Sequence, residues 1–95
     1  MLTINKIKKT VSNIAENYPV NSIDLFGSYA EKRANNKSDI DLLVYFDESV
    51  ASLLDMCGLR LDLQDNLKVS VDVVAAPLSK DSILNIKEMV RIYER

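Results

Sequence analysis

The segment from residue 39 to residue 46, DIDLLVYF, restricts the fold more than any other part of the chain. Apolar side chains occupy every second position of it, at Ile40, Leu42, Val44 and Phe46. Successive side chains of a strand point to opposite faces of its sheet. The alternation therefore predicts a strand that is buried on one face, with Asp39 and Asp41 projecting together from the other.

The rest of the chain alternates between helical and extended patterns. Apolar residues at three- and four-residue spacing predict helices, and β-branched runs predict strands. The predicted helices span residues 3–16, 28–34, 49–66 and 80–93, and the other two predicted strands span residues 21–26 and 69–74. This order predicts an α/β fold, a small mixed β-sheet flanked by helices. A length of 95 residues suits one domain, residues 1–95.

Several local features refine this prediction. Thr3 is the expected cap of the first helix, and NNKS at residues 35–38 is typical of a turn. Two helices carry apolar stripes that we expect to face the core. The stripe of the third helix is Leu53, Leu54, Cys57 and Leu61, and that of the last helix is Ile83, Ile86, Val90 and Tyr93.

Composition excludes several classes of function. The chain has no histidine, so no imidazole base acts in it, and its single cysteine forms neither an internal disulfide nor a zinc site. A net charge of −2 argues against direct DNA binding, which needs a positive surface. Neither a signal peptide nor an apolar run of membrane-spanning length is present. We therefore expect a cytoplasmic protein without a membrane partner.

Three carboxylates form the first candidate site. Asp39 and Asp41 share one strand face, and Asp72 lies in the strand VSVDVV with valines on its opposite face. If the two strands are neighbours, the three carboxylates converge on one patch, where a hard cation such as Mg²⁺ would relieve their repulsion. The alternative interpretation is that these acids bind no metal. Asp39 and Asp41 would then lie in an exposed turn, and Asp72 would lie on the solvated face of a half-buried sheet.

Gly27 and Ser28 form the second candidate site, where a predicted strand meets a predicted helix. Glycine allows a ligand to approach the backbone closely, and a helix N-terminus offers N–H groups to an anion. Ser28 adds a hydroxyl donor. A phosphate-binding corner beside a metal-binding patch suits phosphoryl or nucleotidyl transfer. A glycine and a serine after a strand are also common turn residues.

Together these features resemble a known signature. In LFGSYAEKRANNKSDIDLLV, residues 25–44, ten residues separate Gly-Ser from Asp-X-Asp, and Asp72 follows on a later strand. This pattern resembles the DNA polymerase β-like nucleotidyltransferase superfamily, in particular its minimal nucleotidyltransferase (MNT) group, whose members are often encoded beside a HEPN-domain protein. The resemblance covers nearly the whole chain.

The resemblance implies a role for each matched residue. Gly27 and Ser28 would hold the β- and γ-phosphates of the nucleotide. Asp39 and Asp41 would bind two Mg²⁺ ions, and Asp72 would complete the site of the catalytic metal. Where group members commonly read Gly-Ser-Tyr-Ala-Arg-Gly, this chain has Glu31 and Lys32 in the last two positions. Lys32 or Arg33 is then the candidate to replace the arginine.

The resemblance also implies a biological function. An MNT-type antitoxin would transfer AMP from ATP to a hydroxyl, expected to be a tyrosine, of a HEPN-type ribonuclease toxin, forming a hetero-oligomer with it. Two alternatives remain open at this stage. One is a non-catalytic antitoxin that acts by complex formation alone, and the other is nucleotidyl transfer to a small hydroxyl compound.

Overall fold

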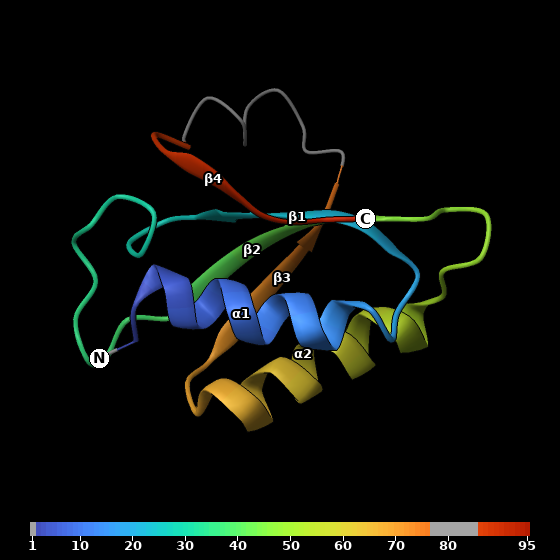
Figure 1. Ribbon diagram of the computed structural model, residues 1–95, viewed down its shortest axis with the longest axis horizontal. Coiled ribbons are helices and arrows are strands. Elements are labelled where there is room, and N and C mark those ends of the chain that lie inside the picture. The colour runs from blue at the N-terminus through green and yellow to red at the C-terminus, as the bar shows by residue number, and fades with distance from the viewer. Residues whose placement is uncertain (1, 77–85) are drawn as a thin grey trace.

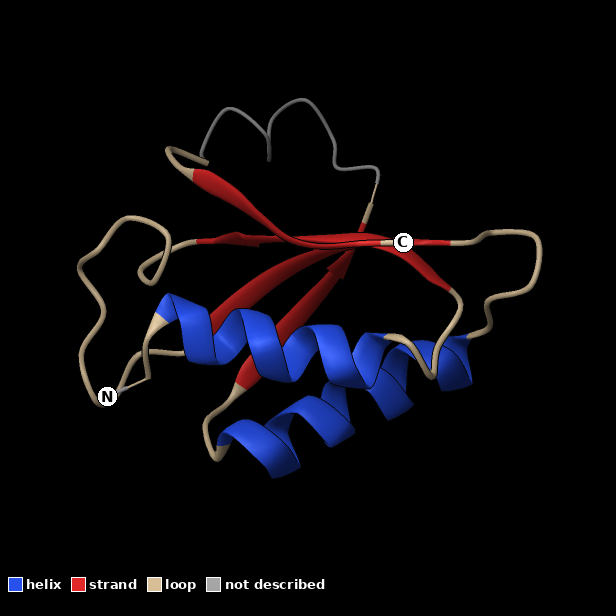
Figure 2. Cartoon of the chain, viewed as in Figure 1, coloured by secondary structure: helices blue, strands red, loops and turns tan. Residues whose placement is uncertain are grey.

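The computed structural model describes residues 2–76 and 86–95. Its elements run in the order α1 (Ile4–Ala15), β1 (Val20–Phe26), β2 (Ile40–Phe46), α2 (Leu53–Leu67), β3 (Val71–Ala75) and β4 (Met89–Glu94). The strands form a four-stranded sheet of order β3-β2-β1-β4, and both helices lie against the same face of it (Figures 1 and 2). The predicted α/β class with a small mixed sheet is thus confirmed.

Strand pairing follows from the connections. β1 pairs antiparallel with both β2 and β4, whereas β2 and β3 are parallel and are joined through α2. A parallel pair requires such a crossover, because the chain must return to the same end of the sheet. As a result, the first residues of β2 and β3 lie side by side, and so do their last residues.

The core lies between the sheet and the helices. In α1, Ile7, Val11 and Ala15 are buried at four-residue spacing, and the Thr3 hydroxyl caps the helix by accepting from the Lys6 N–H at 3.1 Å. From the sheet, alternate side chains complete the core: Ile23, Leu25, Ile40, Leu42, Val44, Val71 and Ile92. The residues between them, including Asp24, Asp41 and Asp72, therefore lie on the face that the helices leave open.

The prediction of a helix over residues 80–93 is wrong for the part of this range that the structure describes, residues 86–93. Residues 89–94 form the edge strand β4, while residues 77–85 lie outside the described part of the chain. Val90 and Tyr93 suit a helical stripe, but Val90 and Ile92 equally suit one face of a strand. Antiparallel pairing with β1, which buries Ile92, decides between the two patterns.

The short helix predicted for residues 28–34 is a set of turns instead. The Glu31 N–H donates to the Gly27 carbonyl at 2.9 Å, so one helical turn forms. Lys32 then adopts a left-handed conformation with φ of 60°, and the Arg33 N–H donates back to the Ser28 carbonyl at 3.0 Å. This bonding pattern ends a helix, and it does so here after a single turn.

The apolar stripe predicted for α2 faces solvent and not the core. Leu59, Leu63 and Leu67 are buried, whereas Leu53, Leu54 and Leu61 are 73%, 82% and 55% exposed. Cys57, expected in the core, is also exposed. Leucines lie on nearly every side of this helix, so the sequence pattern does not identify the buried face. Packing against β3 and α1 determines that the face with Leu59, Leu63 and Leu67 is buried.

Candidate active site

Asp41 and Asp72 occupy matching positions on neighbouring strands. They are directly paired in the parallel register of β2 and β3, so their carboxylates stand together on the open face. Partial burial, the negative charge of Asp72, a hydrogen bond with Asp72 and the charge of Asp39 raise the pKa of Asp41 to about 6. The condition that the sequence left open, that these two strands are neighbours, is met.

Asp39 lies at the edge of this pair. It is exposed and immediately precedes β2, whose first N–H, that of Ile40, donates to the Ser70 carbonyl at 3.0 Å. The predicted turn before it is confirmed, since the Asn35 N–H donates to the Ser38 hydroxyl and the Lys37 N–H donates to the Asn35 side chain. This turn fixes the point at which the chain enters β2.

Over residues 2–76 and 86–95, no three His, Cys, Asp or Glu side chains close around a point that would hold a metal ion. Asp41 and Asp72 form the close pair, and Asp39 lies beside it. The donors nevertheless suit Mg²⁺, which is held in enzymes by one or two carboxylates together with water and substrate phosphates rather than by a complete protein cage. The residues present therefore fit this ion.

Gly27 borders the same carboxylates. Its φ is +76°, and a Cβ built on it would lie 3.0 Å from the Cγ of Asp41 and closer still to one carboxylate oxygen. Glycine is required here both for its backbone conformation and for the space that Asp41 occupies. Gly27 and the paired carboxylates are thus in direct contact.

We expect Gly27→Ala to lower any activity that uses these carboxylates by at least tenfold, because its methyl group displaces the Asp41 carboxylate and misplacement by about 1 Å has large effects on rate. Activity and the Mg²⁺-induced rise in melting temperature should both be measured. Gly58→Ala is the matched control, since its methyl group meets the Tyr18 ring at 3.1 Å instead. Full activity of Gly27→Ala would contradict the assigned contact.

The turn after Gly27 presents backbone donors beside the carboxylates. In a helical turn, the N–H groups before the first intrahelical donor have no partner within the turn. Since the bond to the Gly27 carbonyl comes from Glu31, the N–H groups of residues 28–30 are of this kind. Tyr29 and Ala30, both 5% exposed, anchor the turn in the core. An anion can therefore be held here without a full helix.

The two residues that depart from the MNT pattern have clear local surroundings. Glu31 accepts a hydrogen bond from the Nε of Arg33 at 2.8 Å, and this bond, together with the charges of Arg33 and Lys87, lowers the pKa of Glu31. The charge reversal at Glu31 is thus offset by Arg33. Lys32 takes the left-handed conformation for which glycine is the usual residue.

Lys32→Gly is expected to stabilise the fold by about 1 kcal/mol, since a side chain in the left-handed region costs roughly that much. Urea unfolding would measure the gain. Lys37→Gly is the matched control, because Lys37 is not among the left-handed residues and glycine there only adds freedom to the unfolded chain. A destabilised Lys32→Gly would contradict the explanation.

One polar cluster on the open face was not predicted from the sequence. Asp24 in the middle of β1 is only 6% exposed at its side chain and forms an ion pair with Arg91 of β4. Arg91 donates to Asp24 through Nε and through Nη2, the Nη2–Oδ2 distance being 3.5 Å. Its guanidinium lies 5.5 Å from the centre of the Tyr45 ring. The sequence signal that could have predicted this buried ion pair is Asp24 itself, an acid inside the mostly apolar run SIDLF.

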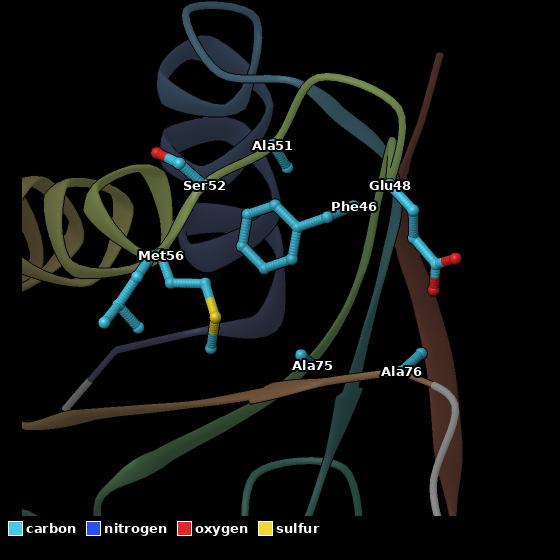
Figure 3. A pocket seen from close by; sticks show the side chains of 8 residues that line it. Phe46, Glu48, Ala51, Ser52, Met56, Ala75 and Ala76 are labelled. Carbon is cyan, nitrogen blue, oxygen red and sulfur yellow. The ribbon is translucent and has the colours of Figure 1, made fainter.

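A hollow beside α2 is not part of this site. It measures about 320 Å³ and lies between the ends of β2 and β3 and the start of α2. Figure 3 shows Phe46, Met56 and Glu48 among the side chains that line it, with the Glu48 carboxylate directed away from the Phe46 ring. The paired carboxylates lie at the opposite ends of these strands.

The chain matches a known protein family over most of its length. Residues 5–95 match the family described as Polymerase beta, Nucleotidyltransferase, and the chain belongs to this family. It is therefore a nucleotidyltransferase, and the MNT resemblance is confirmed. None of the helices in the described ranges is long and apolar enough to span a membrane.

Two curated relatives cover most of the chain. One, named "Putative protein adenylyltransferase MJ0435", from Methanocaldococcus jannaschii, is 41% identical over 88% of this chain and 94% of its own length. The other, "Protein adenylyltransferase MntA" from Thermococcus cleftensis, is 33% identical over 97% of this chain and 98% of its own length. The chain is thus similar to protein adenylyltransferases along nearly its full extent.

Two solved structures share the fold. A toxin–antitoxin crystal structure with AMP-PNP aligns with a TM-score of 0.76 at 18% identity, covering 93% of this chain and 73% of that one. A complex of tri-AMPylated Shewanella oneidensis HEPN toxin with MNT antitoxin aligns with a TM-score of 0.70 at 16% identity, covering 98% and 74%. At these identities the likeness concerns the fold.

Proposed function

We propose that this nucleotidyltransferase transfers AMP from ATP to a hydroxyl of a HEPN-type toxin and so acts as its antitoxin, with Mg²⁺ held by Asp39, Asp41 and Asp72. The observation that carries the proposal is the Asp41–Asp72 pair set against Gly27, because this arrangement would place a cation held by the carboxylates beside a phosphate held by the turn. The named activity of the relatives supports the choice of AMP. The AMPylated toxin in one structural neighbour supports the choice of acceptor.

In this proposal the turn from Gly27 to Ala30 binds the β- and γ-phosphates through its backbone N–H groups and the Ser28 hydroxyl. Asp39, Asp41 and Asp72 balance the charge of the bound cation. Bound Mg²⁺ would supply charge stabilisation for the attacking and leaving oxygens. Asp72, exposed on the edge strand β3, faces the side from which an acceptor hydroxyl can approach.

The reaction then balances simply. The acceptor oxygen forms a bond to the α-phosphorus of ATP, and the bond from that phosphorus to the α,β-bridging oxygen breaks. Pyrophosphate leaves and is held by the Gly27–Ser28 turn. The proton of the acceptor hydroxyl passes to a carboxylate of the site, for which the exposed Asp72 is the candidate.

The test uses labelled ATP, Mg²⁺ and a HEPN-domain protein encoded beside this gene, comparing wild type with Asp39→Asn/Asp41→Asn. Label should enter the partner only with wild type, and the partner's mass should rise by whole AMP units. If neither protein transfers label while both bind and silence the partner, the transfer claim fails and inhibition rests on complex formation.

A further inference from the structure

Lysines border the end of the sheet that carries the candidate active site. β1 ends there, and β2, β3 and β4 begin there, because β1 is antiparallel to β2 and β4 while β3 is parallel to β2 (Figure 1). Each strand connects at this end to a segment with an exposed lysine. These lysines are Lys32 after β1, Lys37 before β2, Lys68 before β3 and Lys87 before β4. We name this group the lysine rim.

Within residues 2–76 and 86–95, no ion pair neutralises a lysine of the rim. The salt bridges found there all use arginine side chains, those of Arg33 and Arg91. Lys87 lies close enough to Glu31 for its charge to lower the pKa of that carboxyl, yet Glu31 accepts its hydrogen bond from Arg33. The rim therefore presents positive charge to solvent around the carboxylates of the site.

Two lysines of the rim have a backbone conformation that is costly for any residue with a side chain. Lys32 and Lys68 have φ of 60° and 61°, and they are the non-glycine residues with positive φ in the described part of the chain. Glycine is the usual residue at such positions, including the end of a helix, where Lys68 caps α2. Strained residues of this kind gather at sites that bind ligands. Since no ion pair offsets the cost, a ligand explains these charges better than folding does.

Lys32 and Lys68 lie on opposite sides of the paired carboxylates. Lys32 follows the turn from Gly27 to Ala30 and, with Tyr29 of that turn, lines a hollow of about 260 Å³. Lys68 ends α2 just before β3, the strand of Asp72. Because neighbouring strands are about 4.8 Å apart, β1 and β3 lie only about 10 Å apart across β2. A group bound above the start of β2 therefore has a lysine on each side.

The ligand that suits this arrangement is a compact polyanion. The carboxylates at the centre, Asp39, Asp41 and Asp72, repel an anion unless cations compensate them. A triphosphate is long enough to meet both a metal ion on the carboxylates and the surrounding lysines, and lysine binds phosphate well as a point charge. Arg33, the other cation in the loop after β1, is held by Glu31. The lysines of the rim are thus the cations left to contact the phosphates.

The two ends of the sheet differ in charge. The connecting segments at the opposite end, residues 16–19 and 47–52, contain Glu16, Asp47 and Glu48 and no basic residue. A charge distribution of this kind draws anions towards the lysine rim and raises the rate at which they bind. A polynucleotide needs a larger positive surface than this, and the net charge of the chain is −2. The rim therefore matches a triphosphate better than a nucleic acid.

We propose that the lysine rim binds the triphosphate of the nucleotide substrate, with Lys32 and Lys68 contacting the phosphates and Lys37 and Lys87 attracting them from a distance. This role rests on the proposed function, in which the triphosphate lies beside Gly27. It adds a basis for selecting the substrate by charge, so that a triphosphate binds more tightly than a monophosphate. Binding weakens as salt screens the lysines.

Isothermal titration calorimetry with inorganic tripolyphosphate and Mg²⁺ tests the rim without requiring AMP transfer. Lys32→Gly/Lys68→Gly should bind tripolyphosphate at least tenfold more weakly than wild type, because two charge-assisted contacts are lost. The same variant should unfold at a higher urea concentration, since glycine relieves both left-handed positions. Weaker binding by a more stable protein distinguishes contact with the ligand from a structural role.

Two further variants control for charge. Lys32→Arg/Lys68→Arg should keep most of the binding. Lys8→Gln/Lys9→Gln, which removes two exposed charges from α1 on the other face of the sheet, should bind like wild type. An equal loss in this control would overturn the proposal, because net charge alone would then account for binding.

Two other outcomes would overturn it as well. One is unchanged affinity in Lys32→Gly/Lys68→Gly, and the other is a wild-type protein that does not bind tripolyphosphate. If tripolyphosphate binds as expected but no AMP is transferred to the partner, the lysine rim stands and the proposed reaction fails.

Discussion

In the proposed reaction with ATP, Mg²⁺ and a HEPN-domain protein, Asp41→Asn is expected to transfer AMP about a thousandfold more slowly than wild type. A metal ion contributes several kcal/mol of charge stabilisation in such reactions, and each 1.4 kcal/mol or so is a factor of ten in rate. Asp41 is the central carboxylate, since it is paired with Asp72 and packed against Gly27. Asp65→Asn, in an exposed acid of α2, should leave the rate unchanged.

The same variant should be more stable than wild type when no metal is present. Burial and the charge of Asp72 raise the pKa of Asp41 to about 6, so the folded state holds this proton more tightly than the unfolded state, where the pKa is near 3.8. The resulting stability is fully present below about pH 4 and is lost as the pH rises through about 6. Metal-free wild type should therefore weaken over this range.

Thermal unfolding between pH 4 and pH 8, with and without Mg²⁺, checks this prediction. Asp41→Asn should not show the loss of stability that ionisation of Asp41 causes in wild type. Its side-chain amide stays neutral and can still donate to Asp72. Mg²⁺ should raise the melting temperature of wild type at neutral pH and have little effect on the variant. Equal stabilisation of both proteins by Mg²⁺ would show that Asp41 does not bind the ion.

Local pattern was enough to place the strands that form this site. Strict alternation identified residues 39–46, and β-branched residues identified 69–74, so Asp41 and Asp72 were expected on faces that could meet. Their register was not predictable, because it depends on how α2 returns the chain to the sheet. Strand pairing is a non-local property that a window of neighbouring residues does not contain.

The errors have the same origin. Residues 89–94 suit both a helix and a strand, and β1, more than 60 positions earlier, decides between them. In α2, leucines surround the helix, so only contact with β3 and α1 selects Leu59, Leu63 and Leu67 for the core. The partner of Asp24 could not be predicted from local sequence pattern either, because Arg91 follows Asp24 by 67 positions.

That ion pair leads to the largest stability effect we expect in the chain. Arg91→Met should destabilise the fold by about 3 kcal/mol, because it leaves the nearly buried carboxylate of Asp24 without its partner. It also removes the contact of the guanidinium with the Tyr45 ring. For a domain of this size, a loss of about 3 kcal/mol lowers the melting temperature by roughly 12–24 °C.

A double-mutant cycle separates this explanation from simple loss of packing. Asp24→Asn removes the buried charge, so Asp24→Asn/Arg91→Met should recover much of the stability that Arg91→Met loses. Arg33→Met, which removes the 66% exposed partner of Glu31, is the matched control and should cost less than about 1 kcal/mol. If the double variant is as unstable as the two single losses added together, then Arg91 stabilises β4 through packing, and neutralising Asp24 is not its role.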